Sequence, residues 1–407
     1  MKAKAPTHSA QILTKRPRVG LLISNISRLG GGVSAFVIKL AQALRSSNIE
    51  PIVFSAQDRY LDEDWSEIVD IEIVSRPVRG PAAIGYLPGL LADMVRSDID
   101  VLHLHGIWQY PSIAAQMWQR RTERPYIVSP HGMLEDWILD HGRAQKWLAK
   151  LVYEKSNLGR ANLVHALTGA EADQIVRFAP GAKTIVMPSG IEIGEAFISD
   201  RPVADPYILY LGRLHPKKNL EAAIDAWAAM GEARGNSRFV IAGWGDEVYV
   251  ADLVKRLEAV GPRTGIDYIG PVYGGGKERI LAGARFLLLP SLSEGLPMTI
   301  LEAWAEGVPV LMSSQCNLPE GFAAGAALDC GISAETIRAT LVRALAIAQE
   351  ERRTMSVAAR DLVARKFSMT RVTESWTDIY RGLLAPSRID GQHISESRSG
   401  RFNVPAG

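Results

Sequence analysis

The sequence predicts an α/β protein made of two doubly wound parallel-sheet domains. Short β-branched, apolar runs alternate with amphipathic helical stretches along most of the 407 residues. Such alternation is typical of parallel strands that are joined and covered by helices. It pauses once, among turn-forming residues that follow Met187, and then resumes. The chain is also long for a single core, which favours two domains.

The first domain is expected to span residues 18–190, after a flexible N-terminal tail at 1–17. The tail is basic and contains no apolar stretch of signal-peptide length. A helix should begin near Ser34, after the first strand. The predicted strands lie at 19–24, 52–55, 71–74, 101–105, 126–129, 163–166 and 184–187.

A linker at 191–206 should lead into the second domain, which we expect at 207–369. Residues 370–385 should form a helix that packs back on the first domain. The Ser-, Arg- and Gly-rich segment 386–407 is expected to be disordered because it has almost no apolar clustering. The predicted strands of this domain lie at 207–211, 239–242, 267–269, 286–289 and 308–311.

The composition excludes several classes of protein. With 47% hydrophobic residues both domains can bury cores, and a net charge of +2 is too small to indicate nucleic acid as the main partner. Cys316 and Cys330 could form one disulfide at most, and we expect both as reduced thiols. No apolar run is long enough to span a bilayer, so the protein is expected in the cytoplasm.

Two carboxylates eight positions apart, Glu294 and Glu302, mark the strongest candidate site. The strand at 286–289 leads through a loop into a helix, for which Pro297 suits the first helical position. The two acids should be about 12 Å apart along the helix axis, wider than a glycosidase pair, so each is expected to hold a different sugar ring. Free backbone amides at this helix start favour a phosphate group, and those expected to take part are Gly295, Leu296, Met298 and Thr299.

A second motif leaves the first strand of the second domain, at 212–219. Its cations Arg213 and Lys218 suit the oxygens of a leaving diphosphate, although a solvated basic turn is the alternative. Gly243 and Gly245 follow the next strand, where they allow either close backbone approach to a ligand or a simple turn. The backbone at 268–272 could read the edge of a nucleobase.

Three glycines, residues 30–32, follow the first strand of the chain and open a helix. Gly31 and Gly32 are expected to approach a phosphate or another substrate group, with a plain tight turn as the alternative. Read with Ala35 the run fits the dinucleotide pattern G-x-G-x-x-A. Nicotinamide binding has little support, because no clear ribose-binding acid follows the second strand.

His131 lies just past a strand end and is the candidate for a hydrogen bond to a reacting sugar, with a structural role as the alternative. His103 and His105 alternate along one strand, and we assign them to opposite faces of it. On that assignment His105 is a candidate acceptor contact, whereas His103 is left to packing.

No metal site is expected. The D-x-D sequence at Asp98 and Asp100 precedes a strand instead of following one. No set of Cys and His residues has the spacing of metal ligands. The G-x-S-x-G and Walker loops of other enzyme classes are absent from the sequence. The stretch 138–160 is basic and amphipathic, so it could be a peripheral membrane contact or an ordinary domain helix.

These motifs occur in one order along the chain: the glycine turn, His131, G-R-x-x-x-x-K and E-x7-E. Over roughly residues 18–385 the chain resembles the retaining GT-B glycosyltransferases of family 4, which have two Rossmann-like domains facing a cleft. The segment 315–321 resembles the branch that builds bacterial exopolysaccharide or O-antigen. The resemblance implies a nucleotide-sugar donor held mainly by the second domain, an acceptor held mainly by the first, retention of configuration and no metal or other cofactor.

The resemblance also implies a role for each motif residue. Arg213 and Lys218 would neutralise the diphosphate, Glu294 would bind donor-sugar hydroxyls and Glu302 the ribose. His131 would hydrogen-bond the donor sugar near its reacting carbon, and the glycine turn would approach the diphosphate.

The leading hypothesis is therefore transfer of a hexose from UDP- or GDP-sugar to a glycan or polyprenyl-diphosphate-linked saccharide at the cytoplasmic membrane face. Three alternatives stay open. They are a phosphorylase or nucleotide-sugar epimerase on the same fold, a catalytically silent carbohydrate-binding protein, and, with least support, a nicotinamide dehydrogenase.

Overall fold

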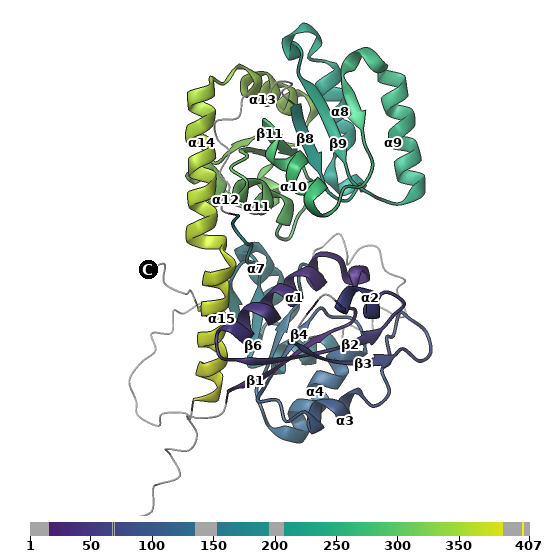
Figure 1. The fold of residues 1–407 in the computed structure, drawn as a ribbon, viewed down its shortest axis with the longest axis vertical. Coiled ribbons are helices and arrows are strands. Elements are labelled where there is room, and N and C mark those ends of the chain that lie inside the picture. Colours follow the sequence, from purple (N-terminus) through teal and green to yellow (C-terminus); the bar gives the residue numbers. More distant parts are fainter. Residues whose placement is uncertain are drawn as a thin grey trace, which may run out of the picture. The chain divides into compact units, whose positions relative to one another are not determined.

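The computed structural model describes residues 16–66, 68, 70–134, 153–194, 207–385 and 401–402. The chain divides into two compact units, one of Met1–Met187 with Val372–Gly407 and one of Pro188–Arg371. Each unit is a parallel sheet with helices around it, so the predicted fold class is confirmed (Figure 1).

The first unit contains an eight-stranded parallel sheet in the order β14-β7-β6-β5-β4-β1-β2-β3. Its strands are β1 (Arg18–Ile23), β2 (Glu50–Gln57), β3 (Glu72–Pro77), β4 (Val101–His105), β5 (Tyr126–Ser129), β6 (Leu163–Ala166), β7 (Thr184–Val186) and β14 (Arg401–Phe402). Its described helices are α1 (Gly31–Ser46), α2 (Leu61–Trp65), α3 (Leu90–Arg96), α4 (Tyr110–Thr122), α7 (Gly169–Phe178) and α15 (Met369–Leu384), the last belonging to this unit from Val372 onward.

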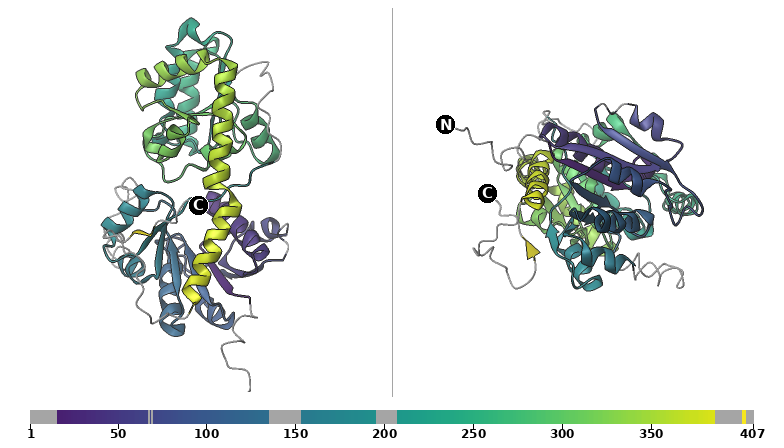
Figure 2. Two further views of the ribbon diagram at one scale, coloured as in Figure 1. Left: turned by 90° about the vertical axis from the view of Figure 1, so that its left-hand side faces the viewer. Right: turned by 90° about the horizontal axis from the view of Figure 1, so that it is seen from below.

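Strand β4 shows how side-chain alternation separates the two faces of this sheet. Leu102 and Leu104 join the apolar cluster that contains Trp118 of α4 and Leu90 of α3. His103 and His105, which alternate with these leucines, face α15 and α1 instead. Figure 2 shows α15 (yellow) lying over this sheet. Because strand order reverses between β1 and β4, the loops that follow these two strands diverge at the switch point, where ligands of such sheets bind.

The second unit contains a six-stranded sheet in the order β10-β9-β8-β11-β12-β13. Its strands are β8 (Tyr207–Leu211), β9 (Arg238–Ala242), β10 (Ile266–Tyr268), β11 (Phe286–Leu289), β12 (Val310–Met312) and β13 (Ala327–Asp329), of which the last was missed by the sequence pattern. Its helices are α8 (Leu220–Ala228), α9 (Glu247–Val260), α10 (Gly274–Ala282), α11 (Met298–Ala305), α12 (Pro319–Ala323), α13 (Ala334–Ala346) and α14 (Gln349–Leu362).

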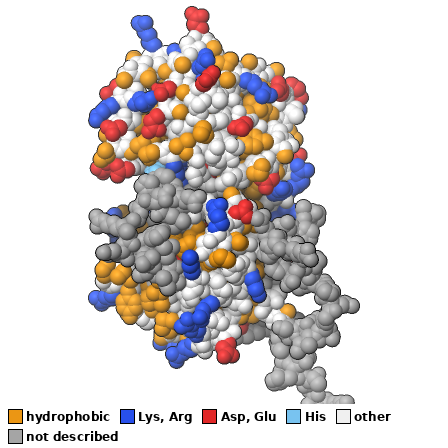
Figure 3. Space-filling model, turned by 180° about the vertical axis from the view of Figure 1, so that it is seen from behind, with side chains coloured by type: hydrophobic (Ala, Val, Ile, Leu, Met, Phe, Trp, Pro, Cys, Tyr) orange, Lys and Arg blue, Asp and Glu red, His pale blue; other side chains and the backbone are white. Residues whose placement is uncertain are grey.

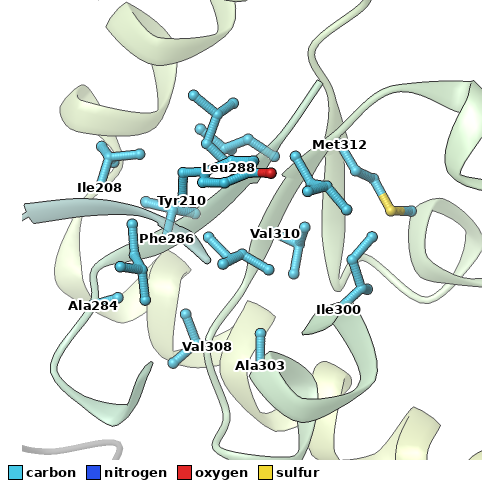
Figure 4. Packing of buried hydrophobic residues seen from close by; sticks show 14 of the residues in the cluster. Ile208, Tyr210, Ala284, Phe286, Leu288, Ile300, Ala303, Val308, Val310 and Met312 are labelled. Atoms are coloured by element: carbon cyan, nitrogen blue, oxygen red, sulfur yellow. The ribbon is translucent and has the colours of Figure 1, made fainter. Parts of the chain in front are cut away.

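The core of the second unit fixes the strands that carry the candidate motifs. Side chains from β8, β11, β12 and α11 point toward one another, among them Tyr210, Leu288, Ile300 and Val310, all fully buried (Figure 4). These strands read as continuous apolar runs because helices cover both of their faces. The switch point lies between β8 and β11.

The boundary between the units differs from the expected one. Residues 188–190 belong to the second unit, and Ile191 is not in a linker but in the core of that unit. The amide of Ile191 donates to the carbonyl of Phe367, and its carbonyl accepts from Met369, so this segment is tied to the end of the unit. The rest of the expected linker, 195–206, and most of both expected tails, 1–15, 386–400 and 403–407, lie outside the described residues.

Candidate active site

The loops after β8 and β11 meet at the switch point of the second sheet and bring Lys218 and Glu294 together. Lys218 ends a 3-10 turn (Pro216–Lys218), and its ammonium forms an ion pair with the Glu294 carboxylate. The two side chains are only 14% and 6% exposed. The sequence predicted both as donor-binding residues but contained no indication that they bind each other.

Hydrogen bonds fix this pair from several sides. The Ser291 hydroxyl donates to Glu294 Oε1 over 2.6 Å, and the amide of Leu292 donates to the carbonyl of Lys217 over 2.8 Å. Asn317, held in the left-handed region, donates its side-chain amide to the carbonyl of Glu294. The carboxylate is therefore preorganised, and a ligand that reaches it meets a fixed group.

Arg213 lies in the same loop but is held in a different way. Its guanidinium lies over the ring of Trp244 at 5.5 Å, and Tyr210 Oη donates to its backbone carbonyl over 2.8 Å. Within the part of the chain that the structure describes, no carboxylate is in ion-pair distance of Arg213. Its charge therefore remains available for an anion, whereas that of Lys218 is offset by Glu294.

Gly243 and Gly245 are required by packing of the two loops. A Cβ on Gly243 would lie 1.9 Å from the carbonyl oxygen of Gly212, and one on Gly245 would lie 2.4 Å from that of Leu214. Leu214 and Gly245 also form a parallel backbone bridge. The structure thus accounts for both glycines as a close approach of protein backbone to protein backbone, which corresponds to the turn alternative.

Helix α11 begins one residue later than expected. Pro297 is its N-cap with extended backbone and not its first helical residue. The amides at the start of a helix have no preceding turn whose carbonyls could accept from them. Among the described residues, four such amides make no hydrogen bond to protein: those of Gly295, Leu296, Met298 and Thr299.

Glu302, on α11, pairs with a cation that lies outside the predicted motifs. Its Oε1 accepts from Lys277 Nζ over 2.6 Å, and its Oε2 is buried without a partner in the described part of the chain.

Beyond β9 and β10 there is a hollow of about 350 Å³ in the same unit. Its lining residues are Trp244, Gly245, Glu247, Val250, Ala251, Tyr268 and Pro271.

In the first unit, the glycine turn follows β1 and opens α1 three residues before the expected start. A Cβ on Gly30 would meet Ser34 Oγ at 1.8 Å, so packing requires this glycine. Gly31 has φ +61° and marks the entry to the helix. A Cβ placed on Gly31 or Gly32 would meet nothing within 4 Å in the part of the chain that the structure describes, and this leaves room for a ligand at the turn.

The assignment of His103 and His105 to opposite faces is wrong. Residues two apart on a strand share a face, and the two rings lie 4.0 Å apart between centroids. His131 stacks on His105 at 5.3 Å, and His165 of β6 lies 6.3 Å from His131. Four histidines therefore form one cluster at this face, bordered by Phe36, Trp376 and Tyr380.

A chain of hydrogen bonds runs through this cluster. The backbone carbonyl at one end of it fixes which group donates in each bond. The carbonyl of Met187 can only accept, so His165 Nε2 donates to it over 2.6 Å, and His165 Nδ1 accepts from the Ser129 hydroxyl over 2.7 Å. Ser129 Oγ then accepts from His103 Nε2, and His103 Nδ1 accepts from Tyr380 Oη, each over 2.7 Å. This order requires neutral imidazoles.

Burial keeps these rings neutral. It lowers the pKa of His165 to about 4 and the pKa of His131 to about 3, with the neighbouring His165 adding to the shift of His131. The pKa values of His103 and His105 are also well below their ordinary range, because of burial first and neighbouring histidines second. At neutral pH the cluster offers hydrogen bonds without positive charge.

The backbone around His131 is held in an uncommon conformation. His131 has φ +55° and Gly132 has φ +76°. Buried Glu171 accepts from the amides of Gly132 over 2.6 Å and Leu167 over 2.8 Å, which fixes the turn after β5. Such strain in a non-glycine residue is typical of functional turns.

Sequence reasoning missed several of these residues. The i, i+2 spacing of His103 and His105 is a signal in the sequence that places both side chains on one face of the strand. Ser129, His165 and Tyr380 lie on three different elements, and no local pattern connects them.

Among the described residues, no three His, Cys, Asp or Glu side chains are arranged to hold a metal ion, and both cysteines are free and buried. No helix in the described ranges has the length and apolarity needed to cross a bilayer. Residues 138–152 of the basic stretch lie outside the described residues, whereas Glu154 is buried and accepts from the Trp108 amide. On the face in Figure 3, charged side chains of both signs and apolar ones are interspersed.

Two doubly wound parallel-sheet units make up the GT-B fold. Residues 31–190 match the model of the glycosyl transferase 4-like domain, and residues 194–361 match that of glycosyl transferases group 1. The chain belongs to the group 1 glycosyltransferases.

Its relatives are distant. A D-inositol 3-phosphate glycosyltransferase of Actinosynnema mirum is 25% identical over 71% of this chain and 77% of its own. An O-antigen chain mannosyltransferase B of Escherichia coli is 32% identical over 42% of this chain and 45% of its own. The solved structure of HepE from Anabaena in complex with UDP is 16% identical, with a TM-score of 0.74 over 90% of this chain and 100% of that chain, which shows a common fold.

Proposed function

We propose that this glycosyltransferase moves a hexose from a UDP- or GDP-sugar to a glycan or polyprenyl-diphosphate-linked saccharide, with retention of configuration, in the synthesis of a bacterial surface polysaccharide. The observation that carries the proposal is the buried Lys218–Glu294 pair at the switch point, with the charge of Arg213 beside it. One solved structure of the same fold has UDP-glucose bound, and one relative is an O-antigen mannosyltransferase, which supports this donor and acceptor class.

In the proposed mechanism, Arg213, Lys218 and the free amides before α11 stabilise the negative charge that develops on the departing diphosphate. These groups are already oriented by the loop contacts, so little reorganisation accompanies charge development. Glu294 accepts hydrogen bonds from donor-sugar hydroxyls and Glu302 from the ribose, for which its Oε2, buried without a partner among the described residues, is suited. His131 donates a hydrogen bond to the donor sugar.

The nucleobase is proposed to occupy the hollow beside Trp244 and Tyr268, which offers aromatic surface next to the loop that carries Arg213. No metal is part of the proposal, because the protein's own cations and amides supply positive charge at the diphosphate. A lipid-linked acceptor would place the enzyme at the cytoplasmic face of the membrane as a peripheral protein.

The test is a screen of UDP- and GDP-sugars by thermal shift, followed by transfer assays with a lipid-linked saccharide and the donors that bind. We expect one donor class to raise the melting temperature, a product with the donor's anomeric configuration by NMR, and unchanged transfer with EDTA present. Lys218→Ala and Glu294→Ala should abolish transfer. Full activity of either variant, or sugar release or epimerisation from the donor alone, would contradict the proposal.

A further inference from the structure

The contact between His105 and His131 requires one ring to carry the shared proton. His105 Nδ1 and His131 Nε2 lie 3.0 Å apart, so one nitrogen donates and the other accepts. Both rings are neutral at ordinary pH, and each therefore has one N–H. The proton position on one ring fixes that on the other.

The surroundings of His105 decide between the two arrangements. His105 is 1% exposed, and its Nε2 is buried with no partner among the residues that the structure describes. If His131 were the donor, the single proton of His105 would lie on this Nε2 and would have no acceptor. Among buried backbone groups, N–H donors without an acceptor are rarer than under-satisfied carbonyl acceptors, and we apply the same preference to the imidazole nitrogen. The proton of His105 therefore belongs on Nδ1.

The tautomer of His131 follows directly. Because His131 Nε2 accepts from His105, the only proton of the neutral His131 ring lies on Nδ1. Among the described residues, no protein group pairs with this Nδ1. The ring consequently presents an N–H donor, and not a lone pair, to whatever binds there.

The neighbours of His105 keep it from rotating out of this arrangement. Its ring lies against His103 at 4.0 Å between centroids and against Phe36 at 6.2 Å. His103 is in turn held at both ring nitrogens by Tyr380 and Ser129. The hydrogen-bond chain that ends at Met187 thus supports the ring that orients His131.

We propose that His105 is a positioning residue that holds His131 as the uncharged Nδ1–H tautomer, so that His131 acts as a hydrogen-bond donor to a sugar oxygen and not as a general base. That the oxygen belongs to the donor sugar rests on the proposed function, whereas the assignment of the tautomer does not. His105 was expected to contact the acceptor; buried behind His131, it acts through that residue instead.

The tautomer is tested on the full chain by NMR of ¹⁵N-labelled histidine, which separates protonated from unprotonated ring nitrogens. In the parent protein His131 should show a protonated Nδ1 and an unprotonated Nε2. His105→Asn should preserve this state, because the Asn amide can donate near the position of Nδ1. His105→Leu should lose it, and His105→Asp should reverse it, because a carboxylate accepts from Nε2–H. A protonated Nε2 in the parent, or no change in His105→Leu, would overturn the inference.

The kinetic arm uses the same variants. His105→Leu should lower kcat by about tenfold to a hundredfold, less than the loss expected from deleting a preorganised donor outright. UDP or GDP affinity should stay unchanged, and His105→Asn should recover most of kcat. Leu104→Ala is the matched control, since Leu104 lies on the same strand but on the opposite face and should destabilise the unit without changing the His131 tautomer. A changed tautomer with unchanged kcat would overturn the positioning role.

Discussion

Lys218 and Glu294 lie 76 positions apart in the sequence and form an ion pair at the switch point of the second sheet. Both charged groups are largely shielded from bulk solvent, so each depends on the other for its electrostatic stabilisation. The same two residues are proposed to receive the donor, which means that the cation of the site is offset by a carboxylate of the same site.

Lys218→Met and Glu294→Gln should each lower the free energy of unfolding by about 3 kcal/mol, because each leaves a poorly solvated charge or acceptor unpaired. The double variant should lose clearly less than the sum of the two, since the pair is removed together. Urea unfolding of the three variants and the parent protein measures the coupling. Additive losses would show that the pair contributes no mutual stabilisation.

Substitution by alanine should change stability by very different amounts at two glycines. Gly243→Ala places a Cβ 1.9 Å from the Gly212 carbonyl oxygen and should cost about 3 kcal/mol of stability. Gly32→Ala, in the first turn of α1, meets no described residue within 4 Å and should change stability by less than about 1 kcal/mol. If the glycine turn approaches the diphosphate, Gly32→Ala should still raise the donor KM about tenfold, near 1.4 kcal/mol. An unchanged KM would assign this turn to folding alone.

Acid should destabilise the first unit through its buried histidines. The pKa of His165 is lowered from 6.5 to about 4, so between these pH values the unfolded chain binds a proton that the folded chain does not. Stability is therefore full above about pH 6.5 and falls with decreasing pH by about 1.4 kcal/mol per unit for this group until about pH 4. Urea unfolding at pH 7, 6 and 5 should show a smaller slope for His165→Gln. An identical slope would place the acid sensitivity elsewhere.

Glu302 can be tested with a donor that lacks the group it is proposed to bind. The parent protein should prefer the ribonucleotide sugar over its 2′-deoxy form, because the buried Oε2 of Glu302 would lose its partner in the deoxy complex. Glu302→Ala should reduce this preference, which corresponds to about 1–3 kcal/mol, toward equality. Lys277→Met is the control, since it removes the ion pair but keeps the acceptor. Equal discrimination in Glu302→Ala and the parent would contradict ribose binding.

Most of the buried strands were located well from the sequence. The predicted bounds of β4, β5, β6, β8 and β11 agree with the structure, because covered parallel strands read as short, largely apolar runs between turn residues. The pattern failed at β13, Ala327–Asp329, which contains neither a β-branched nor an aromatic residue. It also misplaced the unit boundary, since the pairing of Ile191 with the segment around Ser368 joins residues far apart in sequence.

By itself the sequence determined the fold class and the motif residues, because strand and helix periods and the residues that follow each strand are local properties. Only the tertiary structure decided which of those residues meet. The pairing of Lys218 with Glu294 depends on β8 lying beside β11, and that of Glu302 with Lys277 depends on how α10 and α11 pack. The tautomer of His131 depends on the burial of His105 Nε2. Sheet order and burial arise from long-range packing, which no local pattern in the sequence records.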